Sequence, residues 1–248
     1  MGRYEAMLIK KIVEVILNHL NNTYLNVAIY PVGIEYRVQY MNELLSVGVN
    51  DVRIIGICAM GGMGKTTIAK AVFNQLFFNF EDKSFLANVR EISKQPNGQV
   101  HLQEQLLSHI LKRKIKVDNI DRGINVIKER LCNRRVLVIL DDVDRLEQLI
   151  AIAGKRDWFG LGSRIIITTR DEHLLKKIGV DNIYMLNGLD CDESLELFSW
   201  HAFGNRHRIE NYIEFSKDII GYCKGLPLAL EVLGSFLFDR SVPEWKSA

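Results

Sequence analysis

Apolar and polar residues alternate along the middle of the chain in a way that predicts strands and helices in turn. Short runs of aliphatic and β-branched residues predict strands at 53–58, 84–89, 135–140, 164–169 and 183–186. Apolar residues at helical spacing predict helices at 66–80, 102–112 and 123–131. The run RVLVIL at 135–140 is apolar throughout, which is typical of a parallel strand buried on both faces. The alternation predicts an α/β fold, with a parallel sheet that carries helices on both faces.

The N-terminal residues predict helices rather than strands. Residues 4–22 carry an apolar stripe at helical spacing, and residues 36–46 predict another short helix. The sequence Pro31-Val32-Gly33 between them indicates a connection. We therefore expect a connector helix and linker over residues 1–30, followed by an α/β domain over residues 31–189.

The C-terminal part changes to a helical pattern, with no strand-like run after residue 189. Asp192 is a candidate N-cap for the first helix, because a carboxylate there accepts from free backbone N–H groups. Pro227 is placed to open a later helix, where its missing N–H group would have no partner in any case. Helices are predicted over 193–203, over 212–223 and after 227. We expect residues 190–248 to form a small helical domain that the sequence truncates.

The composition describes an ordinary folded protein of 248 residues, with 48% hydrophobic and 25% charged residues. Lys and Arg number 32 against 30 Asp and Glu, a net charge of +2, so we expect no direct nucleic-acid binding. No apolar run approaches the roughly 18 residues of a membrane span, so we expect no membrane association. The four cysteines are isolated from one another, which indicates thiols in a reducing compartment rather than a zinc site or disulfides.

The strongest chemical signal is the sequence AMGGMGKTT at 59–67, between a predicted strand and a predicted helix. Glycines at 61, 62 and 64 allow a tight turn whose N–H groups point at phosphate oxygens. Lys65 can reach terminal phosphates, and the Thr66 hydroxyl suits Mg²⁺. Ala59 stands where the strict pattern has glycine, and the loop tolerates it provided that its φ stays negative.

Two further predicted strands end in polar residues. Asp141 and Asp142 follow the strand at 135–140, where Asp141 would hold Mg²⁺ and Asp142 would orient or deprotonate an attacking water. Arg170 follows the strand at 164–169 and could contact a γ-phosphate through its guanidinium. The alternative for Arg170 is a surface ion pair with Asp171 or Glu172.

Together these motifs resemble one family. The chain is similar to the nucleotide-binding NB-ARC module of plant disease-resistance receptors, relatives of the animal apoptotic protease-activating factor. The matching motifs, in order, are AMGGMGKTT, FLANVRE, LVILDDVD, GSRIIITTRD, LDCDESLELFSWHAF and GLPLAL. The last residue of LVILDDVD, Asp144, resembles the receptors that carry a TIR domain.

The resemblance implies a P-loop NTPase sheet that binds ADP or ATP with Mg²⁺, and it assigns residue roles. Asp141, Asp142 and Arg170 would serve catalysis, and Thr66 and Asp141 would hold the metal. Pro227 of GLPLAL would contact the adenine and tie the helical domain to the ligand. The implied nucleotide-binding residues are Val32, Gly33, Ile34, Gly61, Gly62, Met63, Gly64, Lys65, Thr66, Thr67 and Pro227.

The resemblance also implies a switch, in which ADP holds the receptor closed and exchange for ATP opens it into a signalling oligomer. It implies a cytoplasmic and also nuclear location. The sequence ends before the winged-helix subdomain of the family and includes no TIR or leucine-rich-repeat region, so we expect a fragment. Two alternatives remain open: a P-loop ATPase or kinase with rapid turnover, and a non-catalytic interaction protein.

Overall fold

The sheet contains five parallel strands. The computed structural model describes residues 24–205 and 212–247, so the helix expected over 4–22 lies outside the described residues. The strands lie in the order β2-β3-β4-β1-β5. Their bounds are Arg53–Cys58 (β1), Asp82–Leu86 (β2), Val136–Val143 (β3), Arg164–Thr169 (β4) and Asn182–Met185 (β5). The predicted parallel α/β sheet is therefore confirmed.

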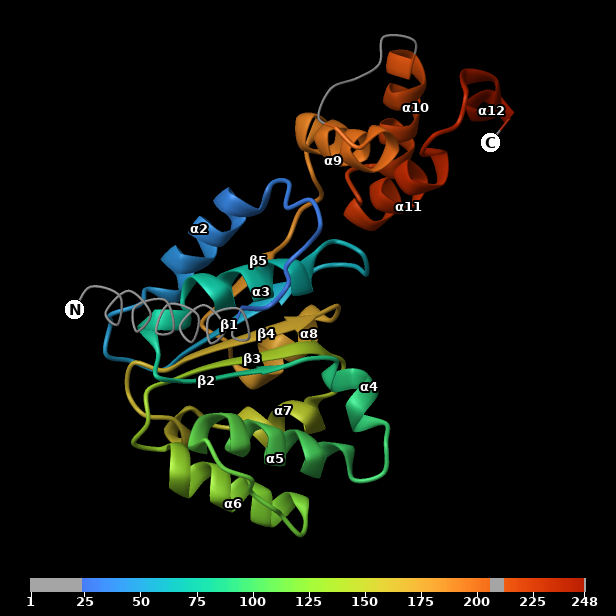
Figure 1. Ribbon diagram of the computed structural model, residues 1–248. Helices are drawn as coiled ribbons and strands as arrows, with labels where there is room; N and C mark the ends of the chain where they lie inside the picture. The colour runs from blue at the N-terminus through green and yellow to red at the C-terminus, as the bar shows by residue number, and fades with distance from the viewer. Residues whose placement is uncertain (1–23, 206–211, 248) are drawn as a thin grey trace, which may run out of the picture.

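Helices cover both faces of the sheet (Figure 1). One face carries α2 (Ile34–Leu45) and α3 (Lys65–Gln75), with a 3₁₀ turn at Phe77–Asn79. The other carries α5 (Gly98–Leu111), α6 (Ile120–Leu131), α7 (Leu146–Ala153), a 3₁₀ turn at Arg156–Trp158 and α8 (Glu172–Ile178). A short helix, α4 (Val89–Ser93), follows β2. No described helix has the length and apolarity that crossing a bilayer requires.

Alternate residues of each strand contribute to opposite hydrophobic cores. Ile55 and Ile57 of β1 pack with α2 and α3, whereas Ile54 packs on the opposite face with α5 to α8. Successive strand side chains point to opposite faces, so a strand covered on both faces must be apolar throughout. This requirement explains the uninterrupted apolar runs in the sequence.

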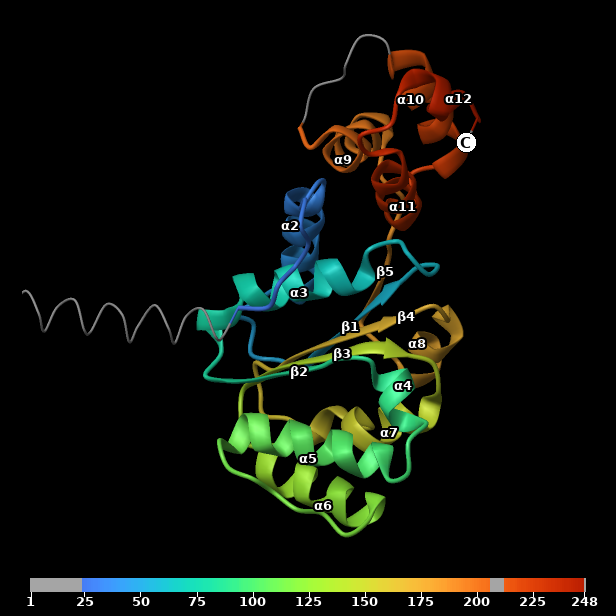
Figure 2. The ribbon, with the colours of Figure 1, turned by 45° about the vertical axis from the view of Figure 1, so that its right-hand side comes forward.

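The C-terminal helices share a separate hydrophobic cluster around Phe198, Leu230 and Trp245. These helices are α9 (Cys191–Phe203), α10 (Ile213–Cys223), α11 (Pro227–Leu237) and α12 (Val242–Ser247). Figures 1 and 2 show them together, beyond α2 and α3 and away from the helices on the other face. Tyr30 and Val32, from the segment before α2, pack against this cluster.

Several boundaries differ from the sequence prediction, among them the following three. The strand predicted at 84–89 lies at Asp82–Leu86, because Asn88 takes a left-handed conformation, with φ of 53°, and Val89 begins α4. The helix predicted at 66–80 is interrupted after Gln75 and continues as a 3₁₀ turn. The strand predicted to end at residue 140 continues through Asp141 and Asp142 to Val143, with an irregular register.

The N-cap of α9 is Asp190, so the prediction of Asp192 is wrong. The Asp190 carboxylate accepts from the Glu193 N–H group, and the Glu193 carboxylate accepts from the Asp190 N–H group. This reciprocal capping box satisfies two N–H groups at once, which a cap at Asp192 inside the first turn could not do.

Arg164, the first residue of β4, is the largest fully buried side chain among the described residues. Its guanidinium pairs with the Asp51 carboxylate at 3.1 Å and donates to backbone carbonyls. The accepting carbonyl oxygens are those of Leu45, Ser46, Val49, Asp51 and Ser163. Arg164 therefore joins the turn between α2 and β1 to the sheet, and the buried carbonyls depend on its N–H donors.

Replacing Arg164→Met should lower the free energy of unfolding by about 3–5 kcal/mol, because several buried carbonyl groups would lose their donor. Urea denaturation of the whole chain measures this loss. The matched control is Arg122→Met on α6, where the Arg122–Asp118 ion pair is exposed and the expected change is within about 0.5 kcal/mol. Equal effects of the two substitutions would contradict the role of Arg164.

Candidate functional site

The carboxyl ends of β1, β3 and β4 bring the sequence-predicted polar motifs together. Cys58 at the end of β1 lies opposite Thr169 at the end of β4, so the glycine-rich loop leaves the sheet beside Arg170. On the other side of β4, the two predicted carboxylates lie near the end of β3, directly before Val143. Carboxyl ends of parallel strands lie at the same edge of a sheet, which is where open α/β sheets bind their ligands.

The glycine-rich loop makes a turn that two of its glycines require. Gly62 and Gly64 have φ of 81° and 84°, a left-handed conformation that other residues rarely adopt. Ala59 is not among the described residues with positive φ, so the loop accommodates it without backbone strain. Gly64 is the N-cap of α3, so the free N–H groups of the first turn face the loop.

Lys65 is held inside this loop. Its side chain is 7% exposed, and its Nζ donates to the carbonyl oxygens of Ala59 and Met60, each at 2.8 Å. Burial, followed by repulsion from Arg170, lowers the pKa of Lys65 below its usual value. An ammonium in these surroundings gains stabilisation from an anion, so the loop favours a phosphate ligand.

Thr66 and Asp141 meet at the base of the loop. The Thr66 hydroxyl donates to Asp141 Oδ1 at 2.8 Å, and the Thr168 hydroxyl donates to the same oxygen at 2.7 Å. Asp141 is buried, and its carboxylate lies at the start of α3, where negative charge is stabilised. A hydroxyl and a carboxylate oxygen this close form an oxygen donor set that fits Mg²⁺.

Asp142 is fixed in an unusual backbone conformation beside this pair. Its φ is 58°, and its N–H group donates to the Thr168 hydroxyl at 2.8 Å. Its carboxylate pairs with Arg90 at 3.0 Å and more distantly with Arg170 at 3.9 Å. A strained conformation that several partners hold in place is common at functional sites.

Arg90 is a site residue that the sequence analysis did not identify. It belongs to α4, directly after β2, and its position after a strand in the motif FLANVRE was the available signal.

The described residues do not form the alternative ion pair of Arg170 with Asp171 or Glu172. Asp171 caps α8 by accepting from the His173 N–H group, and Glu172 pairs with Lys176 at 2.7 Å.

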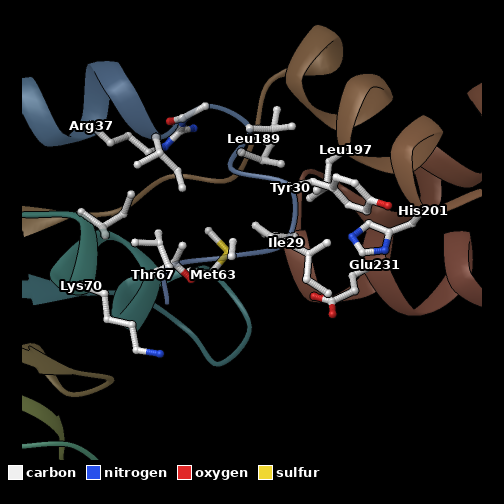
Figure 3. Close-up of a pocket in the computed structure, with 18 of the residues that line it drawn as sticks. Ile29, Tyr30, Arg37, Met63, Thr67, Lys70, Leu189, Leu197, His201 and Glu231 are labelled. Carbon is white, nitrogen blue, oxygen red and sulfur yellow. The ribbon is translucent and has the colours of Figure 1, made fainter. Parts of the chain in front are cut away.

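Two adjoining cavities continue from the loop. The first, of about 370 Å³, lies between the linker before α2, the start of α3 and the C-terminal helices (Figure 3). The predicted residues that line it are Val32, Gly33, Ile34, Met63, Gly64, Thr67 and Pro227. The second, polar cavity is lined by the predicted residues Gly61, Gly62, Gly64, Lys65, Thr66, Thr67, Asp141, Asp142, Arg170 and Pro227.

Helix α11 meets the loop at the junction of the two cavities. The Leu228 N–H group donates to the Gly62 carbonyl at 3.2 Å, so the helix is bonded directly to the phosphate-loop backbone. Pro227 lines both cavities. Any ligand that occupies both cavities would therefore contact the sheet domain and the C-terminal helices together.

An ion pair with a buried guanidinium lies beside the first cavity, which Arg37 lines. Arg37 of α2 pairs with Glu193 of α9 through two hydrogen bonds, of 2.6 and 2.9 Å. The same guanidinium donates to the Gly33 and Gly188 carbonyl oxygens. Burial alone lowers the pKa of Arg37, but pairing with Glu193 raises it above its usual value, so the ion pair stays charged. The sequence analysis missed this clamp, because its partners are remote in sequence.

A glycine-rich loop between a strand and a helix, with a lysine, a hydroxyl and a strand-end carboxylate, defines the P-loop class of nucleotide-binding proteins. A family model described as the NB-ARC domain matches residues 34–208, well over half of the chain. The chain therefore belongs to the NB-ARC domain family.

The chain is similar to plant disease-resistance proteins over nearly its whole length. Disease resistance protein RPV1 of Vitis rotundifolia is 44% identical over 246 residues, and TMV resistance protein N of Nicotiana glutinosa is 41% identical over 251 residues. Each alignment covers 98% of this chain but only 18% and 22% of those proteins. The chain thus spans about a fifth of the length of these relatives.

Solved structures support the fold at low sequence identity. Cdc6p from Pyrobaculum aerophilum matches with a TM-score of 0.57 at 13% identity, over 84% of this chain and 62% of that one. Drosophila ORC bound to DNA matches with a TM-score of 0.58 at 12% identity, over 87% and 58%. These likenesses confirm the parallel sheet followed by helices.

The Arg37–Glu193 clamp should show strong energetic coupling. A double-mutant cycle with Arg37→Ala and Glu193→Ala, followed by urea denaturation, is expected to give a coupling free energy of about 1–3 kcal/mol. The control cycle uses Lys176 and Glu172, an exposed pair on one helix, for which about 0.3–0.5 kcal/mol is expected. Additive effects at Arg37 and Glu193 would show that the clamp does not hold the helices together.

Proposed function

We propose that this chain is the adenine-nucleotide-binding switch of a plant immune receptor. The observation that carries the proposal is the pair of adjoining cavities, one at the phosphate loop and one lined by linker and helical residues. The base would lie among Val32, Gly33, Ile34 and Pro227, and the phosphates would lie along the loop at Lys65. Membership of the NB-ARC family supports this assignment.

Mg²⁺ fits the pair formed by Thr66 and Asp141, where it would neutralise phosphate charge. Asp142 would orient or deprotonate a water, because its carboxylate is held at the edge of the phosphate cavity. Arg170, half exposed above the loop, would contact the γ-phosphate. Hydrolysis of ATP to ADP would be slow, since the proposed role is to time a switch.

The switch would act between a nucleotide-binding domain at 31–189 and a helical domain at 190–248. Support comes from the bond between Leu228 and Gly62 and from the Arg37–Glu193 clamp, which join the two parts around the cavity. We propose that ADP favours the closed state and that ATP favours an oligomer. The names of the relatives support a role in defence. We also propose that the receptor is of the TIR type and is located in the cytoplasm and also the nucleus.

Lys65→Ala should weaken ADP and Mg-ATP binding about 10- to 100-fold, because charge-assisted hydrogen bonds contribute about 1.5–3 kcal/mol. Isothermal titration of the whole chain measures both dissociation constants. Lys176→Ala on α8 is the matched control, since Lys176 lines neither cavity and should leave binding unchanged. Unchanged nucleotide binding by folded Lys65→Ala would refute the proposed site.

Asp142→Asn should slow single-turnover ATP hydrolysis by about 100-fold or more while ADP still binds, because an amide cannot act as a base. Released phosphate measures the rate, and exposed Asp157→Asn is the control. Equal hydrolysis by wild type and Asp142→Asn would remove Asp142 from the mechanism. A wild-type turnover above about 1 s⁻¹ would favour the rapid ATPase over the switch.

A further inference from the structure

Glu231 lies at the junction of the two cavities. It belongs to α11, one helical turn after Pro227, so the two side chains share a face of the helix. Among the residues that line either cavity, only Gly64, Thr67, Pro227 and Glu231 line both. Figure 3 shows Glu231 beside Ile29 and His201, on the side opposite Met63 and Thr67.

Glu231 is exposed, and its carboxylate has no hydrogen-bond or ion-pair partner in the part of the chain that the structure describes. His201 of α9 lies near it, but the His201 Nδ1 is 3.3 Å from the Ser235 hydroxyl. Burial lowers the pKa of His201, and the charge of Glu231 opposes that shift only in part. Since no described side chain bonds to the Glu231 carboxylate, its two oxygens remain available as acceptors.

A carboxylate is not suited to contact a phosphate group directly. Lys65 and Arg170 place positive charge at the phosphate end, whereas Glu231 would repel a phosphate group. The part of a nucleotide that connects base and phosphates is the ribose, and its vicinal hydroxyls are donors. A carboxylate that accepts from a ribose hydroxyl is the chemistry used in dinucleotide-binding folds.

We propose that Glu231 binds the 2′- and 3′-hydroxyl groups of the nucleotide and thereby selects ribonucleotides over deoxynucleotides. The inference rests on the proposed nucleotide-binding function. Each carboxylate oxygen accepts one hydroxyl hydrogen, and Thr67 faces the ribose from α3. Repulsion between Glu231 and phosphate also fixes the direction in which the nucleotide lies, with its phosphates toward Lys65.

The test compares dissociation constants of ADP and 2′,3′-dideoxy-ADP by isothermal titration of the whole chain. Wild type should prefer ADP about tenfold or more, which corresponds to 1.4 kcal/mol. Glu231→Ala should weaken the binding of ADP by that factor and leave the binding of dideoxy-ADP unchanged, so that the preference for ADP disappears. Glu231→Gln, which keeps one carbonyl acceptor, should give an intermediate preference. Glu214→Ala, at an exposed glutamate on α10 that lines neither cavity, should behave as wild type.

The outcomes separate the two proposals. Equal binding of ADP and dideoxy-ADP by wild type would overturn the role of Glu231 while leaving nucleotide binding intact. Equal weakening of both ligands by Glu231→Ala would show that Glu231 acts through the position of α11 rather than on the ribose, and would also overturn it. Failure of wild type to bind either ligand would overturn the proposed function itself, and the ribose inference with it.

Discussion

The parallel pairing of β4 with β1 on one side and β3 on the other is the constraint on which the site depends. It sets the end of β1 opposite Thr169, so the phosphate loop and Arg170 leave the sheet together. It also places Thr168 where its hydroxyl bonds both the Asp141 carboxylate and the Asp142 N–H group. A shift of one residue in either pairing would turn these side chains to the other face of the sheet.

Buried guanidinium groups hold the irregular segments around that sheet. Arg164 donates hydrogen bonds to the carbonyl oxygens of the turn before β1. Arg37 donates to the Gly33 and Gly188 carbonyl oxygens and also pairs with Glu193. Such groups are expensive to desolvate and stay buried only with full sets of acceptors. The linker gains a further contact where Tyr30 stacks on Trp200, with ring centroids 5.0 Å apart. The first cavity is therefore bounded by segments that polar and aromatic contacts fix on both sides.

Charge varies along the combined cavity in a way that suits a nucleotide. Lys65 and Arg170 lie at the phosphate end, the free Glu231 carboxylate lies at the junction, and the linker end is bounded by mostly apolar side chains. Helix α11 contributes both Pro227 and Glu231 to this arrangement and bonds to the loop through Leu228. The C-terminal helices therefore form part of the site, as the proposed switch requires.

The sequence by itself determined the features that depend on near neighbours in the chain. Uninterrupted apolar runs located the strands to within a few residues, and glycine spacing located the phosphate loop, because burial on two faces and left-handed φ restrict local residue choice. Only the tertiary structure decided that Arg90 pairs with Asp142, that Arg37 pairs with Glu193 and that Arg164 is buried. Those side chains carry the same local pattern as solvated surface charges, and their partners are set by packing between segments remote in sequence.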